Sequence, residues 1–337
     1  MKYNLLGKTG LKVSELCLGT MNYGGKGFFR AMGDLQQPEV DEQFKLAVEA
    51  GINFIDTANV YSQGLSEKLI GQAILNLGLN RDDLILATKV RGGMGAKQND
   101  RGLSRKHITL QVEASLKRLK TDYIDLYQIH SLDPLTPFEE TSRVLDDLVR
   151  SGKVRYLGAS NVAAWQLMKA LAYAEHRNLE QFVSLQANYS LDTRDAEREL
   201  IPLLNDQKIG LMVWSPLSGG LLSGKYTRDG QDEEGRLKTF PHPPLHKERA
   251  FDVLDVLRPM AKEKRRSVAQ LALAWLLHQP PVTSVITGAT KLTQLEDNLK
   301  SVDVEFADAE LQKLDEASKL PLEYPGVVID ALAGDRR

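Results

Sequence analysis

The sequence predicts a closed barrel of eight parallel strands, each followed by a helix. Eight short apolar runs recur along the 337 residues, and segments with helical periodicity separate them. Such alternation predicts a parallel sheet, and strands that are apolar throughout predict a sheet covered on both faces. Eight of them in a chain of this length indicate a single-domain (β/α)8 TIM barrel spanning residues 1–337. The runs are ELCLGT (15–20), NFIDTA (53–58), LILATK (84–89), YIDLYQIH (123–130), VRYLGASN (154–161), FVSLQAN (182–188), GLMVWSPL (210–217) and TSVITGA (283–289).

Other segments complete the barrel. Residues 1–14 predict an N-terminal β-hairpin that caps the barrel bottom, because Lys8-Thr9-Gly10 separates two short extended runs. Residues 308–319 predict an extra C-terminal helix, and residues 320–337 a tail. Apolar residues on one face predict the helices between strands. They are clearest in 104–120, 138–152, 163–177 and 267–279, the last of which opens with the capping-box pair Ser267 and Gln270.

The alternative fold is a doubly wound open sheet. That fold normally carries a G-x-G-x-x-G turn after its first strand. Here the first strand ends in Gly19-Thr20-Met21-Asn22-Tyr23-Gly24-Gly25, which does not match. The barrel is therefore favoured.

Composition limits the cellular compartment and the kinds of partner that we expect. A formal net charge of −2 implies no nucleic-acid partner. The single cysteine, Cys17, cannot form an intrachain disulfide and favours a reducing compartment. No apolar run reaches the ~18 residues of a membrane span, the N-terminus does not read as a signal peptide, and no metal-binding motif occurs. We expect a cytoplasmic protein that binds neither a membrane nor a metal; its oligomeric state is open.

Polar residues end successive strands. In this type of barrel the active site lies at the C-terminal ends of the strands. Asp56 ends the second run, Tyr61 lies in the loop after it, Lys89 ends the third and His130 the fourth. Each alone has an ordinary structural interpretation, such as a rim cation or a salt bridge. Together they predict a catalytic site.

The chemistry of this set follows from its charges. Lys89 neutralises Asp56, and its ammonium stabilises the Tyr61 phenolate, lowering a pKa that starts near ~10. Tyr61 would then be a general acid near neutral pH. His130 would hold a substrate oxygen beside the tyrosine.

At this point the chain resembles the aldo-keto reductases over nearly its full length. The resemblance is nearest to the bacterial branch that is also similar to potassium-channel β-subunits. The matching stretches are GINFIDTANVYSQGLSEKLIG, LILATKV, YIDLYQIH, GASN, SLQANYS, WSPLSGGLLSGKY and ITGATKLTQLEDNL.

The resemblance implies the tetrad Asp56, Tyr61, Lys89 and His130, and a nicotinamide cofactor bound without a Rossmann fold. Its implied carboxamide contacts are Ser160, Asn161 and Gln186, and Trp214 is expected to stack on the ring. Backbone N–H groups near glycine approach phosphate closely. The pyrophosphate set is Ser215, Pro216, Leu217, Gly219 and Lys225, and the cofactor set also takes in Gly19, Thr20 and Asp56.

The resemblance also implies a site for the adenosine end at a helix N-terminus, which suits the 2′-phosphate. Much of the family has a lysine where Gly288 stands and an arginine where Gln294 stands, so strict NADPH use is weakened. Thr290 and Lys291 still favour NADPH, with NADH possible. The implied residues are Gly288, Thr290, Lys291, Gln294, Asp297 and Asn298, of which the last three also read as an ordinary helix face.

Substrate and loop expectations complete the prediction. The substrate is expected to be a small-molecule carbonyl. The pocket is expected to be aromatic and apolar, which suits aldehydes and cyclic or aryl ketones over small charged acids. Residues 218–246 form a long polar loop expected to cover the cofactor, with Gly230 and Gly235 permitting motion and Arg236 and Lys238 binding phosphate. A disordered insertion is the alternative for this loop. The expected substrate contacts are Tyr23, Phe28, Phe29, Tyr61, Met94, His130 and Trp214.

Three functions stay open at this stage. The first is NADPH-dependent reduction of an aldehyde or ketone, with the proton from Tyr61. The second is a cofactor-binding regulatory or redox-sensing subunit resembling channel β-subunits. The third is a Schiff-base aldolase that uses Lys89. The tetrad with the carboxamide set favours the first.

Overall fold

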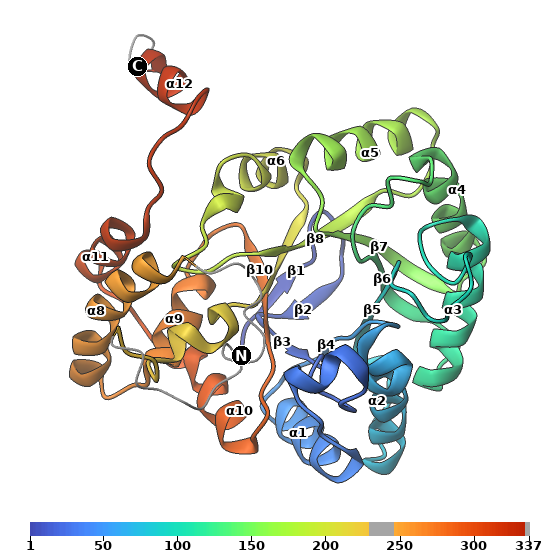
Figure 1. The fold of residues 1–337 in the computed structure, drawn as a ribbon, viewed down its shortest axis with the longest axis horizontal. Helices are drawn as coiled ribbons and strands as arrows, with labels where there is room; N and C mark the ends of the chain where they lie inside the picture. The colour runs from blue at the N-terminus through green and yellow to red at the C-terminus, as the bar shows by residue number, and fades with distance from the viewer. Residues whose placement is uncertain (229–245, 334–337) are drawn as a thin grey trace.

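Eight parallel strands close into a barrel, with helices around it (Figure 1). The computed structural model describes residues 1–228 and 246–333. Neighbouring strands follow chain order, and β10 pairs with β3 to close the ring. The predicted (β/α)8 fold and all eight predicted strands are confirmed. The barrel strands are β3 (Leu16–Gly19), β4 (Phe54–Asp56), β5 (Ile85–Val90), β6 (Ile124–Ile129), β7 (Val154–Ser160), β8 (Phe182–Asn188), β9 (Gly210–Trp214) and β10 (Val282–Thr287).

Helices cover the outside of this ring. The four most clearly predicted helices are present as α3, α4, α5 and α9, and the Ser267–Gln270 capping box opens α9. The described helices are α1 (Gln37–Glu49), α2 (Leu65–Asn76), α3 (Arg105–Leu119), α4 (Phe138–Arg150), α5 (Ala164–His176), α6 (Leu200–Gln207), α8 (Lys247–Lys264), α9 (Val268–Leu277), α10 (Leu292–Leu299), α11 (Asp308–Ser318) and α12 (Gly326–Ala333). No helix in the described ranges is long and apolar enough to cross a membrane.

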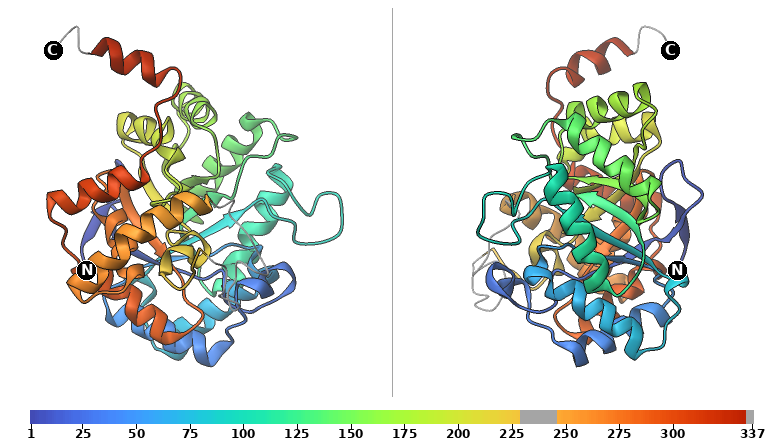
Figure 2. Two further views of the ribbon diagram at one scale, coloured as in Figure 1. Left: turned by 60° about the vertical axis from the view of Figure 1, so that its left-hand side comes forward. Right: turned by 90° about the vertical axis from the view of Figure 1, so that its right-hand side faces the viewer.

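An N-terminal hairpin closes one end of the barrel, as predicted. Strands β1 (Tyr3–Leu5) and β2 (Lys12–Ser14) pair antiparallel, and Asn4 Nδ2 donates a 2.9 Å hydrogen bond to the carbonyl of Thr283 at the start of β10. The hairpin lies at the opposite end from the loops that follow the strands (Figure 2). The loop end is therefore left for a site.

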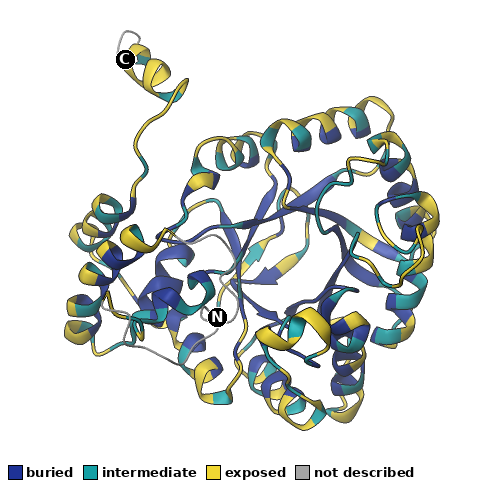
Figure 3. Cartoon of the chain, viewed as in Figure 1, coloured by how far each residue is buried: buried dark blue, intermediate teal, exposed yellow. Residues whose placement is uncertain are grey.

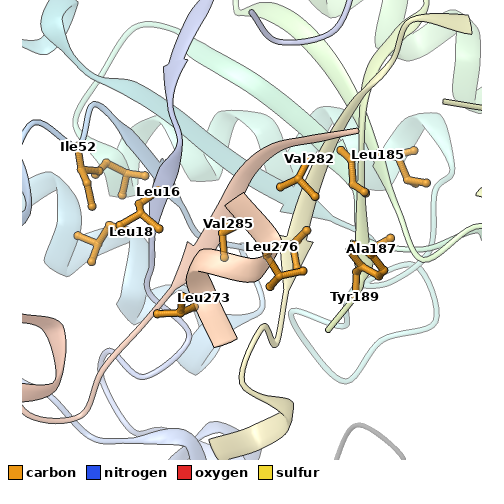
Figure 4. Packing of buried hydrophobic residues seen from close by; sticks show 14 of the residues in the cluster. Leu16, Leu18, Ile52, Leu185, Ala187, Tyr189, Leu273, Leu276, Val282 and Val285 are labelled. Carbon is orange, nitrogen blue, oxygen red and sulfur yellow. The ribbon is translucent and has the colours of Figure 1, made fainter. Parts of the chain in front are cut away.

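The core has two parts, one on each face of the sheet. Strand residues are buried on both faces, while the helices expose their outer sides (Figure 3). Outside the barrel, Leu16, Leu18 and Val285 pack with Leu273 and Leu276 of α9 (Figure 4). A separate inner cluster holds strand residues together with two from the hairpin segment. Its buried members are Leu6, Val13, Cys17, Phe54, Ile85, Ala87, Leu126, Val183 and Met212.

The C-terminal segment differs in part from the prediction. The extra helix α11 is present and packs on α8, but residues 320–337, predicted as a tail, contain the helix α12. Its apolar residues Val328 and Ile329 are exposed, and it projects away from the barrel (Figure 1).

A glycine in α2 sets how closely α2 and α3 approach. A Cβ on Gly71 would lie 2.7 Å from the backbone oxygens of Arg118 and Leu119. Alanine favours a helix by about 1 kcal/mol over glycine, but overpacking costs about 1–3 kcal/mol. We expect Gly71→Ala to lower the free energy of unfolding in urea. Gly10→Ala, where a Cβ meets nothing within 4 Å, is the matched control. Equal stability of the two variants would contradict this account.

Candidate active site

Strand alternation creates a polar layer above the apolar interior. Side chains two residues apart on a strand point to the same face. Phe54, Ile85, Ala87 and Leu126 belong to the inner apolar cluster, so the residues that continue these rows toward the C-terminal ends also point inward. Those residues are Asp56, Lys89 and Gln128, and Lys89 pairs with Gln128 in the sheet register.

Lys89 lies at the centre of this layer. Its side chain is fully buried, and its Nζ lies 2.5 Å from Asp56 Oδ1, 2.8 Å from the carbonyl of Thr57 and 3.3 Å from Tyr61 Oη. Burial opposes the charged form, but Asp56 and Tyr61 together raise the pKa of Lys89 above its ordinary value. The site therefore holds an ammonium group at neutral pH, in contact with the phenol as expected.

The direction of the Tyr61 pKa shift corrects the prediction. The charge of Lys89 does lower this pKa, but burial of the phenol raises it more, and the pKa of Tyr61 lies above its ordinary value. The expected net lowering is wrong because the sequence shows the cation and not the depth of burial. The Tyr61 hydroxyl is thus protonated at neutral pH.

His130 joins the group from the end of β6. Its ring meets that of Tyr61 edge to face, with centroids 5.8 Å apart. Burial and the charges of Lys89 and Arg91 lower the pKa of His130 to about 3. The imidazole is therefore neutral, which suits hydrogen bonding to a substrate oxygen. All four predicted tetrad residues lie at one rim.

Two glutamines complete the surroundings of Asp56. Asp56 Oδ2 accepts hydrogen bonds from Gln128 Nε2 at 3.0 Å and from Gln186 Nε2 at 2.9 Å. Gln128 was missed from the sequence, although a glutamine inside the apolar run YIDLYQIH, two residues before His130, was a usable signal. Gly158 makes room for it, since a Cβ there would lie 2.9 Å from Gln128 Cγ. The carboxylate thus has a charged donor on one oxygen and two amide donors on the other.

The turn that carries Tyr61 is strained and firmly held. Ser62 and Gln63 have left-handed backbones, with φ of 47° and 54°, which costs about 1–2 kcal/mol for each residue. Ser62 Oγ donates to the Tyr23 carbonyl at 2.8 Å and accepts from the backbone of Lys26. This hydrogen bonding holds the turn in place and fixes where the phenol points.

A buried ion pair between α2 and α3 lies next to the same turn. Glu67, in the first turn of α2, is fully buried and accepts from Arg118 Nε on α3 and from Thr88 Oγ1 on β5, each at 2.6 Å. Thr88 precedes Lys89 in β5. Glu67 therefore joins the helix after Tyr61 to the strand that carries Lys89.

The predicted carboxamide residues lie beside the tetrad. Asn161 Nδ2 donates to the carbonyl of His130 and to Ser160 Oγ, both at 2.9 Å, and Trp214 Nε1 donates to Asn161 Oδ1 at 3.1 Å. The ends of β6, β7 and β9 are thereby joined at the rim. Gln186 Nε2 is engaged with Asp56, as described above.

The other predicted cofactor residues follow the remaining strand ends. At the end of β3, Gly19 pairs with Asp56 in the register, and Thr20 Oγ1 donates to the Asp56 carbonyl at 3.0 Å. After β9, Ser215 Oγ accepts from the backbone of Gly219 at 3.1 Å, which shapes the tight turn. Pro216 is buried and Leu217 half-buried in this turn, and Lys225 is exposed.

The start of α10 divides the predicted adenosine residues into two sets. Gly288, Thr290, Lys291 and Gln294 are exposed, and Gln294 Oε1 accepts from the backbones of Thr290 and Lys291. The others have structural bonds. Asp297 accepts from Ser267 and Gln270, and the buried Asn298 donates to Thr287 Oγ1 at 3.0 Å.

The predicted substrate contacts are only partly together. Phe29 lies against Tyr61, with ring centroids 5.2 Å apart. Phe28 lies edge to face on Phe29 and is largely exposed, and Met94 is half-buried. Tyr23 is fully buried in the core, so its predicted contact with substrate is not supported. The sequence predicts a pocket residue here because it places Tyr23 near a strand end and does not show which side chains the helices cover.

The predicted cofactor-covering loop is described only at its start. The short helix η5 (Ser218–Ser223) opens it. Gly230, Gly235, Arg236 and Lys238 lie outside the described residues. Within residues 1–228 and 246–333, no group of three or more His, Cys, Asp or Glu side chains is placed to hold a metal ion.

Comparison with known proteins finds one matching family and several relatives over nearly the full chain. Residues 15–319 match the model of the aldo/keto reductase family. An uncharacterized oxidoreductase, YrpG, of Bacillus subtilis is 40% identical, covering 93% of this chain and 94% of the relative. A probable voltage-gated potassium channel subunit beta of Arabidopsis thaliana is 39% identical, covering 90% and 92%. Norsolorinic acid reductase stcV of Emericella nidulans is 36% identical, covering 94% and 81%.

The low pKa of His130 makes stability depend on pH. An unfolded histidine titrates near ~6.5, whereas His130 in the folded chain titrates at about 3. Between these values the unfolded state binds the additional proton, so stability falls as the pH falls. From pH 7 to pH 5 the parent protein should lose about 1–2 kcal/mol more than His130→Gln, measured by urea unfolding. His176→Gln, at an exposed position, should follow the parent; parallel losses in all three proteins would refute the assignment.

Proposed function

Because this chain belongs to the aldo/keto reductase family, we propose that it reduces an aldehyde or ketone to the alcohol with a nicotinamide cofactor, preferably NADPH. One observation carries this proposal: the buried ammonium of Lys89 contacts both the Asp56 carboxylate and the Tyr61 hydroxyl. That arrangement stabilises a phenolate at the moment a proton leaves. A reductase needs such a group beside the carbonyl oxygen, where negative charge develops.

The residues have separate roles in this mechanism. A carbonyl oxygen lies between Tyr61 and the neutral His130, which orients it by a hydrogen bond. The cofactor, when bound, supplies the hydride that reaches the carbonyl carbon. Tyr61 gives its proton to the oxygen as the alkoxide forms and regains one from solvent afterwards. Its raised pKa keeps the proton in place until then, and Lys89 lowers the cost of the phenolate.

The rim residues fit the proposed cofactor by their chemistry. Trp214 offers an aromatic face, and Ser160, Asn161 and Gln186 offer the donors and acceptors that a carboxamide needs. The turn Ser215–Gly219, with Lys225, would hold the pyrophosphate. At the start of α10, Thr290 and Lys291 are exposed and suit the 2′-phosphate.

A second candidate, a regulatory subunit, is motivated by the relative named a potassium channel subunit beta. Substantial turnover with free carbonyls would favour the reductase, and cofactor binding with negligible turnover would favour the regulator. A Schiff-base aldolase fits less well. Lys89 is fully buried, bonded to three oxygens and charged at neutral pH, which makes its amine a poor nucleophile.

Replacing Tyr61 tests the proton donor. Tyr61→Phe removes only the hydroxyl, so NADPH binding should stay within about twofold while kcat for aldehyde reduction falls about 10²–10⁴-fold. Cofactor oxidation is followed by absorbance and binding by fluorescence titration. Tyr324→Phe, at a largely exposed position, serves as the control. Retention of substantial reduction by Tyr61→Phe would show that another group gives the proton.

Replacing Lys291 tests the cofactor preference. Lys291→Ala removes the cation proposed to face the 2′-phosphate, so the dissociation constant for NADPH should rise about tenfold and that for NADH should stay nearly constant. Lys313→Ala, an exposed change on α11, should alter neither. Equal weakening of NADPH and NADH would place the 2′-phosphate elsewhere.

A further inference from the structure

Arg91 places a positive charge beside His130 at the C-terminal rim of the barrel. It follows β5 directly, and the register pairs Val90 with Ile129. The His130 backbone also donates to the Val90 carbonyl at 2.9 Å. The next positions on the two strands, Arg91 and His130, are therefore neighbours at the C-terminal rim. Consistent with this, the charge of Arg91 lowers the pKa of both His130 and Asp133.

The guanidinium has no ion-pair partner among the described residues. Its Nε is buried and lacks a hydrogen-bond partner within residues 1–228 and 246–333. The carboxylate of Asp133, although nearby, accepts instead from Thr136 Oγ1, the backbone of Leu103 and the backbone of Leu135, at 2.6, 2.9 and 3.1 Å. Burying part of a cation without a partner costs free energy, and such violations gather at functional sites.

The backbone of Arg91 is also unusual. Its φ of 145° is rare for a residue other than glycine, and a 2.9 Å hydrogen bond from the Gly102 backbone to the Arg91 carbonyl helps to hold it. Strain of this kind is retained where the surroundings enforce it, which is often at binding sites. The side-chain observation and the backbone observation are independent and concern the same residue.

We propose that Arg91 is a specificity-determining residue that binds a carboxylate on the carbonyl substrate. This inference rests on the proposed function, because it takes the reacting oxygen to lie between Tyr61 and His130. A planar guanidinium pairs with a carboxylate through two parallel hydrogen bonds. Phe29, beside Tyr61, suits an aromatic ring. The favoured class is thus an aryl aldehyde or ketone that carries a carboxylate, more polar than the apolar substrates the sequence suggested.

A matched pair of substrates tests this inference. 4-Carboxybenzaldehyde carries the anion, and methyl 4-formylbenzoate has nearly the same shape without it. For the parent protein, kcat/KM should be higher for the acid. Arg91→Ala should lower kcat/KM for the acid about 10–100-fold, mainly through KM, and change that for the ester by less than about threefold. Arg91→Lys, which keeps the charge and loses the planar fork, should give an intermediate loss.

Controls separate the possible failures. Arg101→Ala, an exposed change in the same loop, should leave the acid-to-ester ratio unchanged. Equal loss with both substrates in Arg91→Ala, or no preference for the acid in the parent protein, would overturn the assignment. If the parent reduces neither substrate nor other aldehydes, the proposed function fails. Calorimetric titration with terephthalate then decides Arg91: binding lost in Arg91→Ala supports the anion site, and unchanged or absent binding overturns it.

Discussion

The contact between Lys89 and Asp56 is the interaction on which the site depends. Two charges removed from water cost several kcal/mol each, and their attraction offsets that only when geometry and additional hydrogen bonds are good. The structure supplies both. The ion pair is 2.5 Å long, the second carboxylate oxygen receives two amide donors, and the ammonium also meets the Thr57 carbonyl. A buried pair of this kind contributes little to the stability of the fold. Its presence is therefore better explained by the chemistry of the site.

Tyr61 depends on this pair through a balance of opposing effects. Burial alone raises a phenol pKa, and a nearby ammonium alone lowers it. With burial the larger effect, the phenol stays neutral, and the cation reduces the penalty for ionising it. A group in that state is an acid that gives up its proton when an alkoxide forms beside it. In the proposed mechanism the ion pair would therefore affect the transition state more than the resting state, which is what catalysis requires.

The sequence predicted the parts of this arrangement that follow from topology. Parallel strands all end at the same rim, so Asp56, Lys89 and His130 at three successive strand ends had to be neighbours. The role of Gln128 depends on which oxygen of Asp56 remains free, and the burial of Tyr23 depends on how loops and helices pack over it. The direction in which the pKa of Tyr61 shifts depends on the balance between burial, which raises it, and the charge of Lys89, which lowers it. Helix α12 projects away from the barrel (Figure 1), so the strand–helix pattern that predicts the barrel gives no indication of it.

The charged residues at the C-terminal rim bear on both the proposed catalytic site and the proposed choice of substrate. Lys89 is neutralised by Asp56, and His130 is uncharged because burial, together with the charges of Lys89 and Arg91, lowers its pKa. Protonating His130 would add a third cation to this rim. Arg91 is one of the two cations that oppose protonation of the imidazole, and its guanidinium has no ion-pair partner among the described residues. An anionic group on the substrate would supply the missing negative charge close to the reacting carbonyl. In the proposed mechanism the guanidinium would thus select the molecule whose carbonyl His130 orients.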